Sequence, residues 1–403
     1  MTYVPHPVTA LVRAQLDSDT SHGAIIPPLC LSSNFSFAGF GQARKYDYTR
    51  SGNPTRDALA DTLAELEGGC GAVVTASGMA AIFLALQLLP PGGRLLAPHD
   101  CYGGTYRLFE SLAKRGQFEL EFVDQTNLNA VAEALTRKCD LLWIETPSNP
   151  LLRIVDIARL SELGHAAGAI VLADNTFLSP LWQRPLALGA DLVLHSTTKY
   201  INGHSDVVGG VVIAKDRAHL ESLSWWANNI GLSGAPFDAY QTLRGVRTLS
   251  ARLKVHEANA IELAALLEHH PAVKRVYFPG LASHSGHDLA CKQQSSFGAM
   301  LSFELRGGVP HIQALLAGLQ HFSLAESLGG VESLIAHPAT MTHASMPALA
   351  RQVAGISDSL LRVSVGIEDA ADLLSDLRAG LDRAALVSAS RPIAGISSDL
   401  RAA

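Results

Sequence analysis

Short apolar runs alternate with helical segments from about residue 59 to residue 214, and this alternation restricts the possible folds more than any other feature of the chain. The predicted strands cover residues 72–75, 94–97, 119–123, 141–145, 170–173, 192–194 and 207–214. The predicted helices cover residues 58–67, 78–89, 102–115, 127–137 and 157–167. Strands and helices in this order predict βαβ units around a large, mostly parallel sheet. Such sheets bind their ligands at the carboxyl ends of the strands.

The 403-residue chain divides into three predicted parts. Residues 1–58 are rich in proline, serine, glycine and aromatic residues, and we expect them to form an irregular arm ordered against a neighbouring subunit. Residues 59–246 form the predicted sheet domain, and residues 247–403 form a smaller α/β domain. Its predicted elements are a helix over 251–269, strands over 300–304 and 361–365, and a helix over 368–382. We expect the polar tail after about residue 385 to be mobile.

The overall composition argues against several classes of protein. A net charge of −6 without a basic stripe argues against a nucleic-acid partner. The five cysteines are scattered and odd in number, which argues against a disulfide framework or a zinc site and indicates a reducing cytoplasm. His284 and His287 lie three residues apart in a glycine- and serine-rich loop, and we predict no metal site there. The chain shows no secretory leader pattern and no apolar run of about 18 residues, so we predict no membrane segment.

An aspartate and a lysine stand at the ends of two predicted strands. Asp174 ends the run Val-Leu-Ala-Asp, and Lys199 lies in Ser196-Thr-Thr-Lys, just after the strand at 192–194. Alone, each residue is typical of a helix-capping aspartate or a surface lysine. Together they suit pyridoxal 5′-phosphate (PLP), because a lysine amine can bond the cofactor's aldehyde and a carboxylate can pair with its pyridinium nitrogen. The hydroxyl groups beside the lysine can hold the cofactor's phosphate.

Four further residues are candidates for the same site. Gly78 opens a helix whose first amides can bind a phosphate, although an ordinary β–α turn has the same pattern. Tyr102 opens the next helix and can stack on a flat ring or pack on the core. Asn149 follows a predicted strand, where it can meet the cofactor or a substrate carboxylate, or simply form a proline-flanked turn. Arg362 interrupts an apolar strand and therefore needs a partner, either the α-carboxylate of an amino acid or a salt bridge.

Three longer segments carry a family resemblance. They are Ser196-Thr-Thr-Lys-Tyr-Ile-Asn-Gly-His-Ser-Asp206, Asp174-Asn-Thr-Phe177 and Ala325-Glu-Ser-Leu-Gly-Gly-Val-Glu-Ser333. In these segments the chain resembles the Cys/Met-metabolism family of PLP-dependent enzymes, and the resemblance extends to about residue 385. It implies PLP as the cofactor. It also implies the fold type I (aspartate aminotransferase-like) architecture, an α/β fold with a large, mostly parallel seven-stranded sheet and a smaller α/β C-terminal domain.

The resemblance implies a role for each matching residue. The residues that act on the cofactor ring are Lys199, which also moves protons, Asp174 on the pyridinium, Tyr102, which stacks and helps to move protons, and Asn149. The phosphate is held by Gly78, Met79, Ser196 and Thr198, and from a neighbouring subunit by Tyr48 and Arg50. The residues that bind the substrate's α-carboxylate end are Asn149, Ser327 and Arg362. These roles imply a homo-oligomer, for which we expect a tetramer built as a dimer of dimers, and the sequence leaves a single dimer as the alternative.

The reaction depends on the distal part of the substrate pocket. Asp47 and Glu326 are acidic residues that can receive the amino group of cysteine or of the far half of cystathionine. Arg107 can bind a distal carboxylate such as that of a succinyl group. Gly104 stands where methionine γ-lyases typically carry a cysteine. The resemblance favours the cystathionine γ-synthase reaction of methionine biosynthesis and transsulfuration, in which cysteine replaces the γ-substituent of O-succinyl- or O-acetylhomoserine.

Several alternatives remain open at this point. The runner-up is cystathionine γ-lyase, or a bifunctional enzyme, which cleaves cystathionine to cysteine, 2-oxobutanoate and ammonia with the same residues. The sequence does not distinguish succinyl-, acetyl- and phosphohomoserine as the donor. A PLP-binding protein without turnover is disfavoured by the complete set of Lys199, Asp174, Tyr102 and Arg362. A dinucleotide-binding protein is disfavoured because its glycine fingerprint does not follow the first strand of a βαβ unit.

Overall fold

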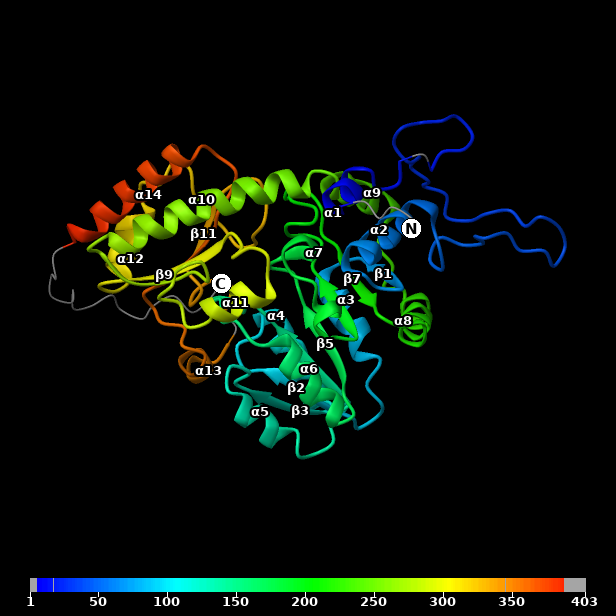
Figure 1. Cartoon of the computed structure of the whole chain (residues 1–403), viewed down its shortest axis with the longest axis horizontal. Coiled ribbons are helices and arrows are strands. Elements are labelled where there is room, and N and C mark those ends of the chain that lie inside the picture. Colours follow the sequence, from blue (N-terminus) through cyan, green and yellow to red (C-terminus); the bar gives the residue numbers. More distant parts are fainter. Residues whose placement is uncertain (1–5, 17, 345, 388–403) are drawn as a thin grey trace, which may run out of the picture.

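Seven strands form the larger of the two sheets (Figure 1). The computed structural model describes residues 6–16, 18–344 and 346–387. The strands are β1 (Gly71–Thr75), β2 (Arg94–Pro98), β3 (Glu119–Val123), β4 (Leu141–Glu145), β5 (Ile170–Asp174), β6 (Leu192–His195) and β7 (Gly210–Ala214). Their order across the sheet is β1-β7-β6-β5-β4-β2-β3, and of these strands β7 alone runs opposite to the others. The predicted fold, a large and mostly parallel sheet of seven strands, is therefore confirmed.

Helices cover both faces of this sheet. They are α2 (Pro54–Glu67), α3 (Gly78–Leu86), α4 (Gly103–Lys114), α5 (Leu128–Ala134), α6 (Ile157–Ala166), α7 (Ser179–Trp182), the short 3₁₀ helix η1 (Pro185–Leu188), α8 (Arg217–Ile230) and α9 (Pro236–Val246). Successive residues of β4 point to opposite faces: Trp143 packs edge-on against Phe109 of α4, whereas Ile144 belongs to the cluster that contains Leu160 of α6. Every residue of β4 is buried, as expected for a strand covered on both sides.

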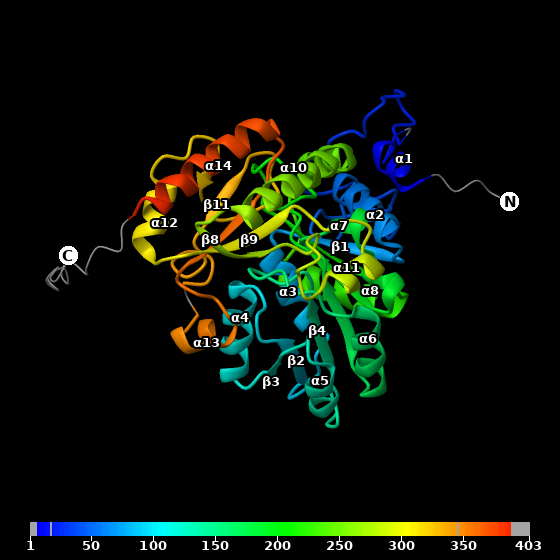
Figure 2. The same ribbon diagram turned by 60° about the vertical axis from the view of Figure 1, so that its left-hand side comes forward.

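A second sheet of five strands follows in the C-terminal part of the chain. Its strands are β8 (Val273–Tyr277), β9 (Met300–Leu305), β10 (Ser323–Leu324), β11 (Leu334–Ala336) and β12 (Leu360–Ser364), in the order β10-β11-β12-β9-β8. The accompanying helices are α10 (Leu249–His269), α11 (His287–Gln293), α12 (Val309–Leu316), α13 (Ala348–Val353) and α14 (Ala370–Ala385). Figure 2 shows α10, α12 and α14 gathered beside this sheet, which confirms the expected smaller α/β part. Because β12 is the central strand, it is fully buried.

The N-terminal segment extends away from the rest of the molecule (Figure 1). It contains the short helix α1 (Pro7–Val12), which the sequence pattern did not predict, and then irregular chain with isolated bridges such as Asn34–Tyr48. The next helix, α2, begins at Pro54 rather than at the predicted residue 58. It starts there because the side chain of Asn53 accepts hydrogen bonds from two backbone N–H groups of the first turn, and proline is favoured at the first helical position.

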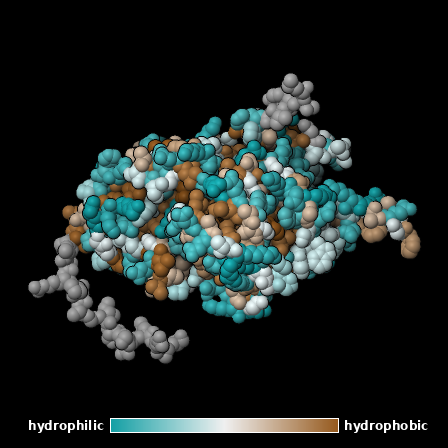
Figure 3. Space-filling model, turned by 60° about the horizontal axis from the view of Figure 1, so that its bottom comes forward, coloured by the Kyte–Doolittle hydropathy of each residue, from teal (hydrophilic) through white to brown (hydrophobic). Residues whose placement is uncertain are grey.

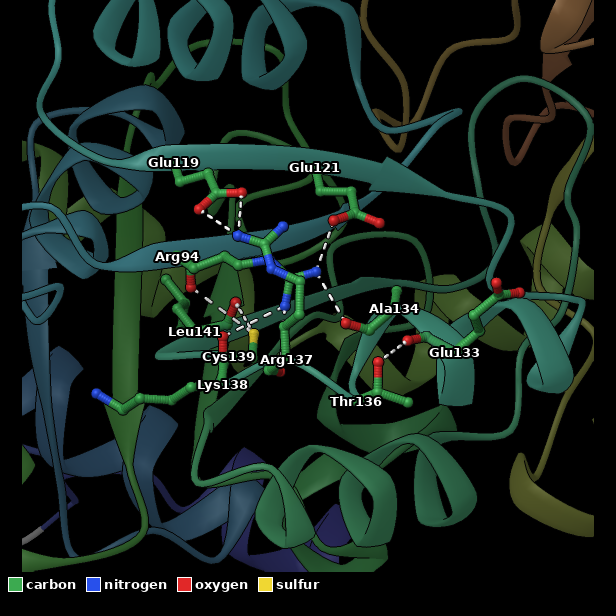
Figure 4. Close-up of polar contacts among 10 residues, drawn as sticks. All are labelled: Arg94, Glu119, Glu121, Glu133, Ala134, Thr136, Arg137, Lys138, Cys139 and Leu141. Atoms are coloured by element: carbon green, nitrogen blue, oxygen red, sulfur yellow. Dashed lines mark hydrogen bonds and ion pairs between the residues drawn. The ribbon is translucent and has the colours of Figure 1, made fainter.

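A buried arginine closes the opposite end of the large sheet (Figure 4). Arg94 begins β2, and its guanidinium donates hydrogen bonds of 2.6 Å to Glu121 on β3 and 2.8 Å to the carbonyl of Ala134 at the end of α5. Beside it, Arg137 binds both carboxylate oxygens of Glu119. These contacts join two strands and a helix at the edge where the parallel strands begin, far from their carboxyl ends.

The bounds of β7 and of the last helix differ from those predicted, and two helices were not predicted. The predicted strand at 207–214 begins only at Gly210, because Gly209 instead exchanges hydrogen bonds with the side chain of Thr198. Helices α8 and α9 were not predicted, although α9 buries Ala239, Leu243 and Val246 on one face and α8 buries Leu223 and Ala227. The last helix continues to Ala385. Most of the predicted mobile tail, residues 388–403, lies outside the described residues. No helix within the described ranges is long and apolar enough to cross a bilayer.

Candidate active site

A cavity of about 500 Å³ lies at the carboxyl ends of the large-sheet strands, where β12 of the small sheet approaches them. Twelve of the fifteen predicted site residues line it: Gly78, Met79, Tyr102, Arg107, Asn149, Asp174, Ser196, Thr198, Lys199, Glu326, Ser327 and Arg362. This location follows from the parallel topology, which places the ends of β4, β5 and β6 side by side. The sequence segments that carry these residues are thus brought together by the fold.

Lys199 lies in the turn that follows β6. Its Nζ donates a 2.7 Å hydrogen bond to the Oγ of Ser327. Burial, and then the positive charge of Arg362, lower the pKa of Lys199 from its ordinary 10.5 to about 8, while Glu326 acts in the opposite direction. A lysine with this pKa is partly neutral close to physiological pH, so its amine can act as a nucleophile and as a base.

Asp174 ends β5 and faces the same cavity. Its Oδ1 accepts a 3.0 Å hydrogen bond from the backbone N–H of Thr176. Burial raises the pKa of Asp174, and the hydrogen bonds of Thr176 and the nearby His195 limit this rise. Within the described ranges Asp174 forms no ion pair with a lysine or arginine. A buried carboxyl in this situation is suited to a cationic N–H group of a bound ligand.

The start of α3 and the loop after β6 form one end of the cavity. Ser77 caps α3 by accepting a 3.0 Å hydrogen bond from Ala80 N–H, while the N–H groups of Gly78 and Met79, at the start of the helix, have no acceptor inside it. A Cβ atom at Gly78 would lie only 2.9 Å from the Cβ of Ser196, so glycine allows the helix to approach the loop this closely. Amides at a helix start, next to hydroxyl groups, suit a phosphate.

Tyr102 forms another wall. The residue is 42% exposed and lines the cavity, so its side chain is accessible to a ligand. A Cβ at Gly104 would lie 2.5 Å from Cε1 of this ring. A side chain at position 104, such as the cysteine expected for methionine γ-lyases, would therefore displace the Tyr102 ring from the position that it has here.

Arg362 projects from β12 and is 3% exposed. Its Nη1 donates a 3.0 Å hydrogen bond to Oδ1 of Asn149, and its Nη2 donates a 2.7 Å hydrogen bond to the carbonyl of Ser327. Its Nε is buried without a hydrogen-bond partner. Burial lowers the pKa of Arg362 to about 10. A buried guanidinium with an unused N–H is suited to a ligand carboxylate.

The distal residues divide into two groups. Arg107 and Glu326 both line the cavity. Asp47, Tyr48 and Arg50 do not: Nη1 of Arg50 donates a 2.6 Å hydrogen bond to the carbonyl of Asn228, on the side of α8, and Asp47 accepts from Ser51. The prediction that Asp47 and Glu326 share a pocket is therefore not met within one chain. That Asp47, Tyr48 and Arg50 contribute to the site of a neighbouring subunit stays a prediction.

Several residues of the cavity were not predicted from the sequence. Glu145 lines it from the end of β4, directly beside Asp174 in the sheet register. The position of Glu145 at a strand end was a usable signal, because the same argument identified Asp174. Met341, Thr342 and Ala344 line it from a loop that precedes α13, and no local pattern marks that loop.

These residues fit PLP. The lysine amine, the carboxyl without a cation and the glycine-lined helix start match the cofactor's aldehyde, ring nitrogen and phosphate, and Arg362 is left for an amino-acid carboxylate. In the part of the chain that the structure describes, no group of three or more histidine, cysteine, aspartate or glutamate residues could hold a metal ion. The arrangement can therefore support carbanion chemistry on an amino acid.

Known proteins share this organisation along nearly the whole chain. Residues 8–382 match the model of the family described as "Cys/Met metabolism PLP-dependent enzyme". Cystathionine gamma-synthase of Escherichia coli K12 is 56% identical over 92% of this chain and 97% of its own length. Cystathionine beta-lyase of Coxiella burnetii is 48% identical over 93% of this chain and 98% of its own length. The crystal structure of cystathionine gamma synthase from Xanthomonas oryzae pv. oryzae, in complex with aminoacrylate and cysteine, superposes with a TM-score of 0.94 at 61% identity, covering 95% and 99% of the two chains.

Proposed function

The chain belongs to the Cys/Met metabolism family of PLP-dependent enzymes, and on that premise we propose that it catalyses the cystathionine γ-synthase reaction. In this reaction cysteine replaces the γ-substituent of an O-acylated homoserine to give cystathionine. The observation that carries the proposal is the shared cavity of Lys199, Asp174 and Arg362, because it joins a cofactor-bonding amine, a pyridinium partner and a carboxylate anchor. The similarity to synthases from two bacteria supports γ-replacement over the lyase direction.

When bound at this cavity, PLP supplies an aldehyde that amines can bond and a ring that withdraws electrons from the substrate's Cα. Arg362 binds the substrate α-carboxylate, held in place by its hydrogen bonds to Asn149 and Ser327. Asp174 would pair with the ring nitrogen, and Tyr102 would lie against the ring. Lys199 Nζ takes the proton from Cα and returns it, because its lowered pKa leaves part of the amine neutral.

The distal pocket sets the choice of substrate in this proposal. Arg107 faces the carboxylate of a succinyl donor, and Glu326 faces the ammonium of the incoming cysteine. Both residues line the cavity and are exposed to it, as groups that meet a ligand must be. O-succinylhomoserine is therefore the donor that we expect to react best.

The protein is also proposed to act as a homo-oligomer, most simply a tetramer made of two dimers. Hydrophobic side chains lie open on the N-terminal arm, including Ile25, Leu31 and Phe40, and Figure 3 shows apolar residues at the end of the arm. Tyr48 and Arg50 lie on this arm and away from their own cavity. An arm that covers a second copy would bury these side chains and bring both residues to the neighbour's phosphate site. We place the enzyme in the cytoplasm, in agreement with its five free cysteines.

Product analysis tests the proposed reaction. The purified enzyme is incubated with O-succinyl-, O-acetyl- or phosphohomoserine, each with and without cysteine, and separately with cystathionine. Cystathionine formed from an acyl donor and cysteine, and lost in Lys199→Ala, supports the proposal. Rapid release of 2-oxobutanoate from cystathionine, without synthesis, would instead identify a lyase.

A further inference from the structure

We propose that Glu145 is a positioning residue whose carboxyl holds Tyr102 and Asn149 in place through their backbone N–H groups. Glu145 ends β4, and its Cα pairs with that of Asp174 in the neighbouring strand. The inference rests on the proposed function, because Tyr102 and Asn149 act there on the cofactor ring and on Arg362.

The first contact fixes the start of α4. The backbone N–H of Tyr102 donates a 2.9 Å hydrogen bond to Oε2 of Glu145. Tyr102 is the N-cap of α4, and no side chain of its own caps that helix. Glu145 therefore holds the Tyr102 backbone from one side, while the close approach to Gly104 limits the ring from the other. The hydrogen bond to Glu145 thus fixes the backbone from which the Tyr102 ring projects.

The second contact fixes the loop that binds Arg362. The backbone N–H of Asn149 also favours the charged form of Glu145, which acts to lower the pKa of its carboxyl. The side chain of the same Asn149 accepts the 3.0 Å hydrogen bond from Arg362. One carboxyl thus links the ring-stacking residue to the carboxylate anchor, although the two belong to different segments of the chain.

The burial of a carboxyl at Glu145 argues against a purely structural role. Glu145 is 6% exposed and forms no ion pair among the described residues. Burial, followed by the carboxylate of Asp174, raises the pKa of Glu145 well above its usual range, and Asp100 adds to the rise. Only the N–H groups of Tyr102 and Asn149 act in the opposite direction. An apolar side chain would fill this place at lower cost, so what the carboxyl offers is its two hydrogen-bond acceptors.

Two variants and one matched control test the proposal. Glu145→Ala removes both acceptors, and Glu145→Gln keeps the length of the side chain but only one acceptor. Gln125→Ala is the control, because the buried Gln125 donates a 2.6 Å hydrogen bond to the carbonyl of Trp143 on the same strand and does not line the cavity. Each protein is stripped of PLP and titrated with it by fluorescence. The visible circular dichroism of the PLP-loaded protein, its melting temperature, kcat and KM are then measured.

Glu145→Ala is expected to bind PLP about tenfold more weakly, to show altered visible circular dichroism and to have an approximately tenfold higher KM for the acyl homoserine, since two buried N–H groups lose their acceptor. Glu145→Gln should lie between this variant and the wild type, and Gln125→Ala should lower only the melting temperature. The proposal is overturned if Glu145→Ala matches Gln125→Ala in PLP affinity, dichroism and KM. If Glu145→Ala does not fold, Glu145→Gln decides: the proposal is overturned if this variant has the PLP affinity, visible dichroism and KM of the wild type. Failure of the wild type to make cystathionine would refute the proposed function, whereas PLP affinity and dichroism still test Glu145.

Discussion

Lys199 donates a 2.7 Å hydrogen bond to the side chain of Ser327, and the backbone carbonyl of that serine accepts a 2.7 Å hydrogen bond from Arg362. Ser327 also has a backbone φ of +84°, in the left-handed region that few serines adopt. A single residue in an uncommon conformation therefore contacts both the amine that we propose to move protons and the guanidinium that we propose to anchor the substrate.

Ser327→Ala should lower kcat more than it raises KM. The substitution keeps the backbone carbonyl that Arg362 contacts and removes the hydroxyl that orients Lys199. Loss of one such hydrogen bond typically costs about 1–1.5 kcal/mol, which corresponds to about a tenfold decrease in kcat. Steady-state kinetics of cystathionine formation measure both constants. Ser364→Ala, on β12, removes a hydroxyl that accepts from Gly329 instead and should leave kcat close to wild type. Equal losses in the two variants would contradict the role given to Ser327.

PLP uptake by the stripped enzyme should depend on the protonation of Lys199. Its pKa is about 8 in the folded protein, so the rate of covalent PLP attachment should rise with pH around a midpoint near 8. Arg362→Met removes the second of the two causes of this low pKa and should move the midpoint upward. A midpoint above 10 in the wild type would contradict the prediction.

Folding stability should also depend on this lysine. Because the unfolded chain binds more protons between about pH 8 and 10.5, Lys199 should make the free energy of unfolding rise with pH over that interval. Below pH 8 its full destabilising effect is present.

Subunits with different defects should complement each other. Arg50→Ala should retain PLP poorly, and Lys199→Ala should be inactive, but a mixed oligomer contains sites built from two intact halves. Mixed and exchanged enzymes should therefore regain part of the wild-type activity, up to about a quarter in the simplest two-subunit site. Tagged subunits confirm that exchange has occurred. Activity no greater than that of the separate mutants, despite confirmed exchange, would show that Arg50 does not serve a neighbour.

Arg107→Ala should impair the succinyl donor selectively. A lost charge-assisted contact costs about 1.5–3 kcal/mol, or about ten- to a hundredfold in kcat/KM. O-acetylhomoserine has no distal carboxylate and should be affected much less. Glu326→Ala should instead raise the KM for cysteine, because it removes a partner of the ammonium group. Equal losses with the two esters in Arg107→Ala would indicate that this arginine only shapes the pocket.

Arg94→Met should lower stability without changing catalysis. The arginine is buried at the end of the sheet opposite the cavity and binds Glu121 and the carbonyl of Ala134 (Figure 4). Leaving these partners without their donor should cost about 3–5 kcal/mol of unfolding free energy. Urea unfolding measures this loss, and the kinetics of the folded variant should stay within about twofold of the wild type. Arg137→Met, on the exposed pair with Glu119, is the control and should cost less than about 1 kcal/mol.

The fold was predictable because the apolar strands carry their own signal. β5 and β6 are short, mostly apolar runs, and parallel topology then requires their carboxyl ends to meet. This reasoning alone placed Asp174 and Lys199 together. Arg362 was identifiable for a different reason, since a charge in the middle of an apolar strand must have a partner.

The remaining parts depend on tertiary contacts that no local pattern carries. The loop with Met341 and Thr342 reaches the cavity only because β12 lies against the large sheet. The start of α2 depended on the side chain of Asn53, whose capping role the general boundary argument overlooked. The composition of residues 1–58 predicted an irregular arm, but it did not predict which surface the arm covers, because no local pattern carries that information.

Arg362 belongs to the small sheet and Asp174 to the large one, so in the proposed function a substrate bonded to PLP would be held by both sheets. The cofactor joined to its substrate would then connect the two sheets, over a length equal to the distance from the ring nitrogen to the substrate carboxylate. Small relative movements of the two sheets would change the distance between Asp174 and Arg362. Substitutions far from the chemistry, along the contact between the two parts, should therefore change turnover with little change in the cavity's composition.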